Sequence, residues 1–151
     1  MIEEPAWQRV AAYVVCRDTE GRVLLTHLHL PGLPSHRSWT LPGGGMDRGE
    51  QPTDTALREL HEETGLTATL GPLLGVRSSW LEPHETATGT PGHALAILFE
   101  ATALSGDLRT EFPPGSTDEA AWFTRDEIAA LPRVPLVDVA LELLAARGPH
   151  R

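Results

Sequence analysis

The sequence contains no lysine and only one cysteine, Cys16, among its 151 residues. Without a lysine amine, the chain cannot form a Schiff base or supply the lysine of a Walker-type phosphate loop. One cysteine cannot close a disulfide within the chain, and alone it supports neither a thiolate zinc site nor an iron–sulfur cluster. These absences exclude several classes of enzyme, and Cys16, which lies in an apolar stretch, is expected to be a core residue.

Long apolar runs are also absent, because none approaches the roughly 20 residues that a membrane-spanning helix needs. The first residues, Met1 to Pro5, are acidic where a secretory signal would be basic and then apolar. We therefore expect a cytoplasmic protein. A length of 151 residues predicts a single domain over residues 1–151, with an ordered core over about residues 9–147.

Positive charge is scarce: 12 arginines stand against 21 acidic residues, which gives a formal net charge of −9. A surplus of negative charge repels long polyanions, so neither nucleic acid nor an anionic membrane is expected as a partner. A small nucleotide or other phosphorylated substrate remains compatible with this charge if metal ions neutralise it.

The order of the predicted elements favours an α/β fold with a mixed sheet and helices on its faces. Strands over Val10–Cys16 and Arg22–Leu30, separated by a turn at Asp18–Gly21, predict a hairpin. A tight loop is expected at the three glycines after Pro42. The other expected elements are a short strand over Ser38–Leu41, a helix over Pro52–Thr64, β-rich segments over Leu66–Leu81 and His93–Leu104, a short strand over Ala120–Phe123, and helices over Arg125–Leu131 and Leu136–Arg147.

The helix expected over Pro52–Thr64 carries three glutamates, Glu59, Glu62 and Glu63, within about 100° of one another. Such carboxylates repel one another by a few tenths of a kcal/mol per pair unless a cation offsets them. Mg²⁺ or Mn²⁺ prefers oxygen ligands and commonly bridges carboxylates to substrate phosphates. Three glutamates alone would indicate solvated surface, but next to a glycine-rich loop they predict a divalent-metal site.

The spacing around this helix matches the pattern G-x5-E-x7-R-E-U-x-E-E-x-G-U, in which U is aliphatic, without a departure. A chance match in a chain of this size is on the order of one in a million. In this segment the chain resembles the Nudix hydrolase family, and it does so more weakly at Leu41–Gly44 and at Asp118–Ile128. The matching residues are Gly44, Glu50, Arg58, Glu59, Leu60, Glu62, Glu63, Gly65 and Leu66.

The resemblance implies an α/β/α sandwich with a mixed β-sheet, and metal-dependent hydrolysis of a nucleoside diphosphate linked to another group. By resemblance, Glu59, Glu62 and Glu63 are divalent-metal ligands, with the carbonyl of Gly44 or Gly45 near the same ions. Glu59 or one of its neighbours takes a proton from the attacking water. Mg²⁺ is the expected ion, with Mn²⁺ as an alternative.

Four residues of the pattern are expected to support the site. Arg58 and Glu50 look like the family's internal pair, in which the arginine braces the loop against the helix. A small displacement of the metal ligands would cost far more in rate than such an exposed pair adds to stability. Gly44 belongs to the loop that leads into the helix, and Gly65 ends the helix.

Outside the pattern, Glu119 is the candidate for an additional ligand or base, because the family often supplies a carboxylate from a loop before the late strand. Asp118 and Glu85 are its rivals, and a solvated loop acid is the alternative. Trp39 and Trp80 are candidates for stacking on a nucleobase, although a tryptophan next to a strand is more often a packing residue.

The substrate is not encoded in a readable pattern. The short chain looks more like nucleoside triphosphate pyrophosphohydrolases than like the longer ADP-ribose-cleaving members. Pro83 lies near a position where ADP-ribose-cleaving relatives carry a proline, so an ADP-ribose or nucleotide-sugar pyrophosphatase is the alternative. A nucleotide-binding module without turnover and a purely structural domain are the non-enzymatic alternatives, and the resemblance is compatible with a homodimer.

Overall fold

The structure, a computed structural model, describes residues 3–30 and 37–148, in which the strands form two sheets. The larger sheet is mixed, since β1 and β6 are parallel and its other neighbours are antiparallel. Its strands, in spatial order, are β4 (Gly43–Gly45), β1 (Trp7–Val15), β6 (Gly92–Ser105) and β5 (Thr67–Leu81). The smaller, antiparallel sheet contains β3 (Trp39–Thr40), β2 (Val23–Leu28) and β7 (Thr117–Phe123) in that order.

The helices lie close to the predicted positions: α1 spans Pro52–Thr64, α2 Arg125–Ala129 and α3 Pro135–Arg147, with a short 3₁₀ turn, η1, at Pro83–Glu85. Gly65 ends α1 as expected, because its φ of 80° is a left-handed conformation that favours glycine. No helix within the described residues is long and apolar enough to cross a membrane.

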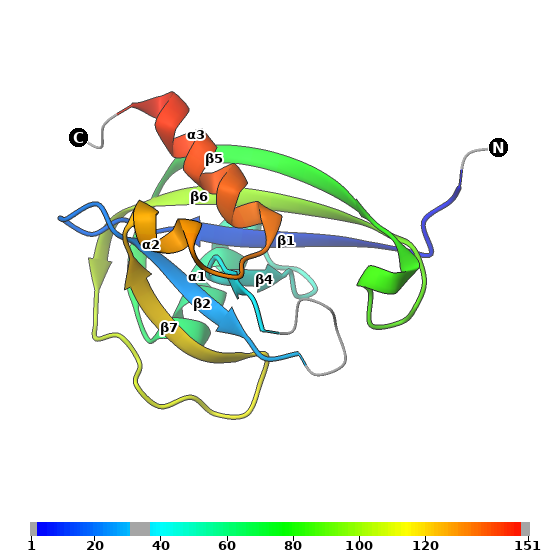
Figure 1. Ribbon diagram of the computed structural model, residues 1–151, viewed down its shortest axis with the longest axis horizontal. Coiled ribbons are helices and arrows are strands. Elements are labelled where there is room, and N and C mark those ends of the chain that lie inside the picture. The colour runs from blue at the N-terminus through cyan, green and yellow to red at the C-terminus, as the bar shows by residue number, and fades with distance from the viewer. Residues whose placement is uncertain (1–2, 31–36, 149–151) are drawn as a thin grey trace.

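Alternating side chains of the strands pack against helices on opposite sides, which creates the layers visible in Figure 1. Val14 and Leu24 belong to the cluster that contains Ala56 and Leu60 of α1. Their neighbours Val15 and Leu25 belong to the cluster that contains the buried face of α3. The α/β/α arrangement of the mixed fold is therefore confirmed, and Cys16 is fully buried on the α1 side.

The hairpin predicted between the first two strands is wrong. β1 and β2 lie in different sheets. Their contact is next to the turn, where an antiparallel bridge joins Arg17 to Val23 and backbone hydrogen bonds join Asp18 to Arg22 and Leu24 to Cys16. β1 pairs along its whole length with β6, which is about eighty residues away in the sequence. A turn signal reports local geometry only, so it could not reveal this distant partner.

The glycine loop also differs from its prediction, because Gly43–Gly45 form β4, which pairs antiparallel with Ala11–Tyr13 of β1. The sequence suggested a loop because glycine is rare within strands. Here the absence of side chains allows β4 to lie against β1 on one side and α1 on the other. This strand determines where the acidic side of α1 begins.

Candidate active site

The site forms where β4 passes beside α1. A Cβ atom added to Gly44 would lie 2.8 Å from the carboxyl carbon of Glu59, so only glycine allows this approach. The chain then turns through residues 46–51 into the first turn of α1, where Gln51 and Asp54 form a capping box. The glycine-rich strand and the acidic helix are thereby held as one unit.

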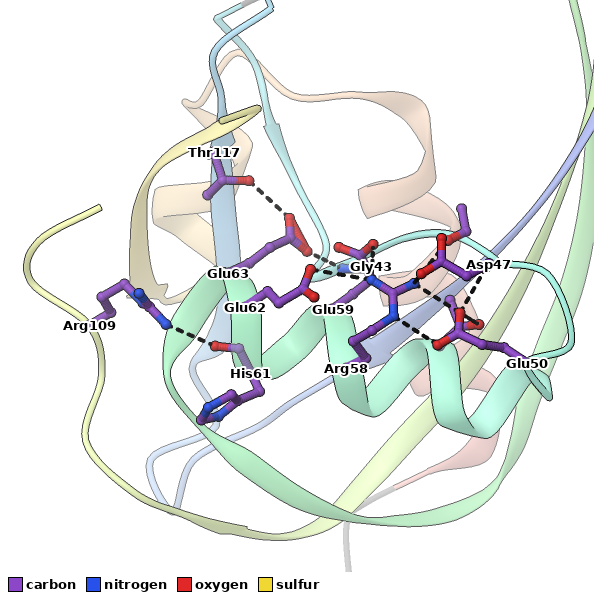
Figure 2. A network of polar contacts seen from close by, with 12 residues as sticks. Gly43, Asp47, Glu50, Arg58, Glu59, His61, Glu62, Glu63, Arg109 and Thr117 are labelled. Atoms are coloured by element: carbon purple, nitrogen blue, oxygen red, sulfur yellow. Dashed lines mark hydrogen bonds and ion pairs between the residues drawn. The ribbon is translucent and has the colours of Figure 1, made fainter. Parts of the chain in front are cut away.

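Arg58 lies at the centre of the polar network in Figure 2. Its Nε and Nη2 atoms donate to the two carboxylate oxygens of Glu50 at 2.8 and 2.9 Å, which is the bidentate geometry that arginine favours. Nη1 donates to Glu59 at 3.0 Å and to Glu62 at 3.2 Å, and Nη2 reaches the carbonyl of Gly45 at 3.3 Å. The predicted pair of Arg58 and Glu50 is present, and it connects the loop, the helix and β4.

Glu50 is held as a carboxylate by its donors. Besides Arg58, it accepts hydrogen bonds from the backbone N–H of Asp47 at 2.8 Å and from the hydroxyl of Thr55 at 2.9 Å. The hydrogen bonds from Arg58, followed by the one from Asp47, lower the pKa of Glu50 to about 2. Arg58 is in turn surrounded by acids, which raise the pKa of its guanidinium further.

Glu63, at the other end of the acidic face, has a different environment. It accepts a hydrogen bond from the backbone N–H of Gly43 at 2.7 Å and one from the hydroxyl of Thr117 at 2.9 Å. Burial is the largest influence and raises the pKa of Glu63 to about 8, assisted by the charges of Glu59 and Glu62. Burial also raises the pKa of Glu59, although Arg58 opposes that shift.

Helical geometry alone suggested that the three helix glutamates share one solvated face. In the structure, their side chains are exposed to different degrees. The side chain of Glu62 is 56% exposed, whereas that of Glu59 is 18% exposed because it lies against β4. Glu63 is directed toward β4 and β7 through its two hydrogen bonds. Tertiary contacts therefore give three chemically similar residues three different environments.

Two cavities open at these glutamates. The larger, of about 700 Å³, lies beside β4 and contains Glu59 and Glu63 together with Arg9, Tyr13 and Trp80 in its lining. The smaller, of about 370 Å³, is formed by Glu59, Glu62 and Glu63 with the loop between β6 and β7. Both volumes lie in the range of small-molecule sites.

The oxygen chemistry of this cluster fits a hard divalent ion, because carboxylates and a backbone carbonyl are the ligands that Mg²⁺ prefers. Burial raises the pKa of Glu63 in spite of its hydrogen bonds from Gly43 and Thr117, so a bound cation would favour its ionised form. Across residues 3–30 and 37–148, no group of three His, Cys, Asp or Glu side chains is arranged to hold a metal as it stands. Here Glu59 and Glu62 are bonded to Arg58, and Glu63 is bonded to Gly43 and Thr117.

The two candidate tryptophans occupy different environments. Trp39 is 8% exposed and packs between the rings of His27 and Phe123, with centroid distances of 4.9 and 4.7 Å. It lines neither of the two cavities, which is the packing alternative that the sequence left open. Trp80 is 36% exposed, lines the larger cavity and stays a candidate for stacking on a substrate ring.

The candidate acids outside the sequence pattern also lie in different surroundings. Glu119 lies within β7, not in a loop before it as predicted, and it lines neither cavity. Asp118 bonds Nδ1 of His27 at 2.6 Å. Glu85, in η1, lines the larger cavity and caps the backbone N–H of Glu82. Of the three, only Glu85 shares a cavity with Glu59 and Glu63.

Sequence reasoning missed the donor that Glu63 meets on β7. Thr117 is 54 residues away in the chain and is a common type of strand residue, so no spacing marks it. Gly43 belongs to the segment Leu41–Gly44, where a resemblance was expected, but a hydrogen bond from its backbone N–H to Glu63 was not expected. Both contacts depend on how β4 and β7 are placed beside α1.

Comparison with known proteins adds a family match to this geometry. A family model described as NUDIX domain matches residues 7–144. The RNA pyrophosphohydrolase of Bartonella quintana is 54% identical over 46 residues, which are 30% of this chain and 26% of the relative. That of Psychrobacter cryohalolentis is 40% identical over 68 residues, 45% of this chain and 36% of the relative. The chain thus matches well under half of the length of these curated relatives.

Solved structures match over nearly the whole chain. The MutT NUDIX hydrolase of Burkholderia pseudomallei is 28% identical with a TM-score of 0.75, and the match covers 91% of this chain and 98% of that one. The NUDIX domain of Shewanella oneidensis NrtR, crystallised with ADP ribose, has a TM-score of 0.70 at 19% identity, over 96% and 90% of the two chains. The second likeness concerns the fold alone.

Proposed function

Because this chain belongs to the Nudix domain family, we propose that it is a metal-dependent pyrophosphohydrolase that cleaves the diphosphate linkage of a nucleoside diphosphate derivative. The observation that carries the proposal is that Glu59, Glu62 and Glu63 line one cavity, and that Glu59 and Glu63 also line a second cavity beside the glycine strand β4. A solvated acidic helix would not place two of these carboxylates in partly buried positions between cavities.

Glu59, Glu62 and Glu63, with the backbone carbonyl of Gly44, would hold the divalent ion. When bound, Mg²⁺ or Mn²⁺ offsets the charge of the diphosphate and increases the acidity of a bound water. Glu59 or an adjacent glutamate accepts the proton of the attacking water, so no protein nucleophile is required. Glu59 lies against the backbone of Gly44, which keeps its carboxylate at the glycine strand.

Arg58 acts as a positioning residue. Its two hydrogen bonds to Glu50 leave one nitrogen, Nη1, to orient Glu59 and Glu62. Gly65 ends α1 at the turn after Glu63, so the last carboxylate stays within the helix. The chain thus supplies a rigid frame for ligands that must be placed within fractions of an ångström.

The leading substrate candidate from the sequence is a nucleoside triphosphate, and the alternative is ADP-ribose or a nucleotide sugar. The names of the curated relatives favour a further candidate, the 5′ phosphates of RNA. The net charge of −9 weighs against a long RNA. Metal ions at the site would offset the charge of its terminal phosphates only, and the negative charge of the protein would repel the other phosphates.

The test is turnover of a panel of nucleoside triphosphates, nucleotide sugars and a short 5′-triphosphorylated RNA with Mg²⁺ or Mn²⁺, followed by detection of phosphate and pyrophosphate. We expect hydrolysis at a diphosphate linkage that stops in excess chelator. Full turnover with chelator would reject the metal-dependent mechanism. Nucleotide binding without turnover would identify the chain as a nucleotide-binding module.

A further inference from the structure

The carboxylate of Glu63 connects the two sheets of the fold. Its Oε1 accepts a hydrogen bond at 2.7 Å from the backbone N–H of Gly43 on β4, in the larger sheet. Its Oε2 accepts one at 2.9 Å from the hydroxyl of Thr117 on β7, in the smaller sheet. The terminal torsion of a glutamate side chain is broad when it is free. Here the two hydrogen bonds hold it, because each oxygen is bonded to a different sheet.

The two donors are fixed in different ways. The N–H of Gly43 is placed by the backbone, since Gly43 pairs with Tyr13 of β1 and an added Cβ would overlap the carbonyl oxygen of Ala12. The donor of Thr117 is a side chain, so its position depends on the face that β7 turns toward α1. It can also be removed by substitution while the backbone stays in place.

A β-bulge in β7 turns Thr117 toward α1. The register with β2 passes from Glu119 to Thr117 while β2 advances by one residue, so Asp118 is the extra residue. In an unbroken strand, Thr117 and Trp122 would lie on opposite faces, because they are five residues apart. The bulge places them on the same face, and Trp122 packs against the cluster that contains Leu60 of α1. Bulges redirect side chains in this way and are frequent next to active sites.

Contacts with β2 anchor the bulge on both sides. The carboxylate of Asp118 bonds Nδ1 of His27 at 2.6 Å. Beyond the bulge, the backbone N–H of His29 donates to the carbonyl of Ser116 at 2.7 Å, so the pairing of the two segments continues. Thr117 lies between these two contacts and is only 8% exposed, which leaves its hydroxyl little freedom to turn to solvent.

From this geometry we infer that Thr117 is a positioning residue, whose hydroxyl orients the carboxylate of Glu63 for the divalent ion. The inference rests on the proposed function and adds to it a residue outside the sequence pattern. An ionised carboxylate has about four lone-pair sites. The two hydrogen bonds use one on each oxygen, so one on each oxygen remains for a cation.

The test removes the hydroxyl of Thr117 and keeps the shape of the side chain. Thr117→Val replaces the hydroxyl by a methyl group, whereas Thr117→Ser keeps the hydroxyl and loses the methyl group. Binding of Mn²⁺ to the full chain is measured by titration calorimetry without substrate. We expect the dissociation constant to rise by about tenfold in Thr117→Val, because partners that orient metal ligands have effects of about 10–100-fold. In Thr117→Ser it should stay within about twofold of wild type.

Thr26→Val is the matched control. Thr26 is fully buried on the neighbouring strand β2, and its hydroxyl has no hydrogen-bond partner among the described residues. This variant makes the same chemical change at a buried strand position without removing a donor from Glu63. Its dissociation constant for Mn²⁺ should therefore stay within about twofold of wild type.

Kinetics separate a positioning role from contact with the substrate. With a substrate that the panel identifies and saturating metal, Thr117→Val should lower kcat by about tenfold and change KM by less than about twofold. A rise in KM with unchanged kcat would overturn the positioning role, because uniform substrate binding would then be lost.

Three further outcomes would overturn the inference. The first is an unchanged affinity for Mn²⁺ in a folded Thr117→Val. The second is an equal loss of affinity in Thr117→Ser, which would make the methyl group responsible. If Thr117→Val does not fold, Thr117→Ala is compared with Thr117→Ser, and equal affinities in that pair are the third.

Failure of the proposed function would look different. If the wild-type chain neither binds Mn²⁺ nor hydrolyses any member of the panel, the pyrophosphohydrolase proposal itself is rejected, together with the role of Thr117. If the wild-type chain binds Mn²⁺ and hydrolyses a substrate, unchanged behaviour of Thr117→Val rejects the role of Thr117 alone.

Discussion

Glu50, in the loop before α1, and Glu63, near the end of α1, have opposite environments. Around Arg58, each carboxylate meets a donor, and the pKa of Glu50 is lowered to about 2. Around Glu63, burial exceeds the effect of two hydrogen bonds, and the pKa is raised to about 8. The same residue type is therefore stabilised as an anion at one end and penalised as an anion at the other.

This difference distinguishes the residues of the motif that hold the site in place from those that bind a ligand. A fully paired network holds geometry but has little capacity for a new ligand, because its charges are already satisfied. A partly buried carboxylate with insufficient donors gains more from an incoming cation. We therefore propose that Arg58 and Glu50 position the site, and that Glu63 binds the metal ion together with Glu59 and Glu62, which Arg58 orients through Nη1.

The largest expected effect comes from removing charge at the ligand end. Glu62→Gln and Glu63→Gln should each lower kcat by at least about 100-fold, because a carboxylate that holds the divalent ion is lost. The fold should be retained, and without metal it should be slightly more stable because repulsion is relieved. The exposed Glu142 on α3 provides a control, since Glu142→Gln should leave kcat unchanged. Near-normal rates in both site variants would show that these residues are not ligands.

A smaller effect is expected at the positioning end. Arg58→Lys keeps the charge but cannot form the bidentate contact with Glu50 while also reaching Glu59, so kcat should fall by about tenfold or more. Arg22→Lys, at the partly buried pair with Asp18, is the matched control. Kinetics and melting temperature are measured together. A loss of stability with unchanged kcat would assign Arg58 to folding only.

The pH dependence of stability tests the difference directly. In metal-free protein the pKa of Glu63 is about 8, above its ordinary value of 4.5, so the folded state binds the proton more tightly than the unfolded state. The resulting stabilisation is complete below about pH 4.5 and is lost as the pH rises through about 8. The melting temperature of wild type should therefore fall relative to Glu63→Gln over this range, as measured by thermal scans.

Two comparisons sharpen the interpretation of that pH effect. Added Mg²⁺ should raise the melting temperature of wild type most at the alkaline end, where Glu63 is ionised and able to bind it. A difference between wild type and Glu63→Gln that does not change with pH would show that Glu63 titrates normally.

The smallest effect is expected at Glu119, which lies in β7 outside both cavities. Glu119→Gln should change kcat by less than about twofold, because a carboxylate that does not reach the reacting atoms adds little to the barrier. Glu85→Gln, at an acid that does line the larger cavity, is the informative comparison. A fall in kcat of about tenfold or more in Glu119→Gln, but not in Glu85→Gln, would show that Glu119 supplies the additional base.

The sequence by itself determined the local elements and the chemistry-bearing segment. The boundaries of α1 were predictable because Pro52 and Gly65 act within a few residues of the helix ends. The contact between Glu50 and Arg58 was expected from the resemblance, and it spans only eight residues along the chain. The separation of apolar and acidic flanks of α1 followed from its helical period.

Only the tertiary structure decided how these parts meet. It paired β1 with β6 rather than β2, made a strand of Gly43–Gly45, and packed Trp39 in the core while leaving Trp80 at a cavity. It also joined Glu63 to Thr117 and so separated the environments of three equivalent glutamates. The physical reason is range: caps, turns and helical periodicity act over a few residues, whereas sheet pairing, burial and cavity lining depend on segments that approach only after folding.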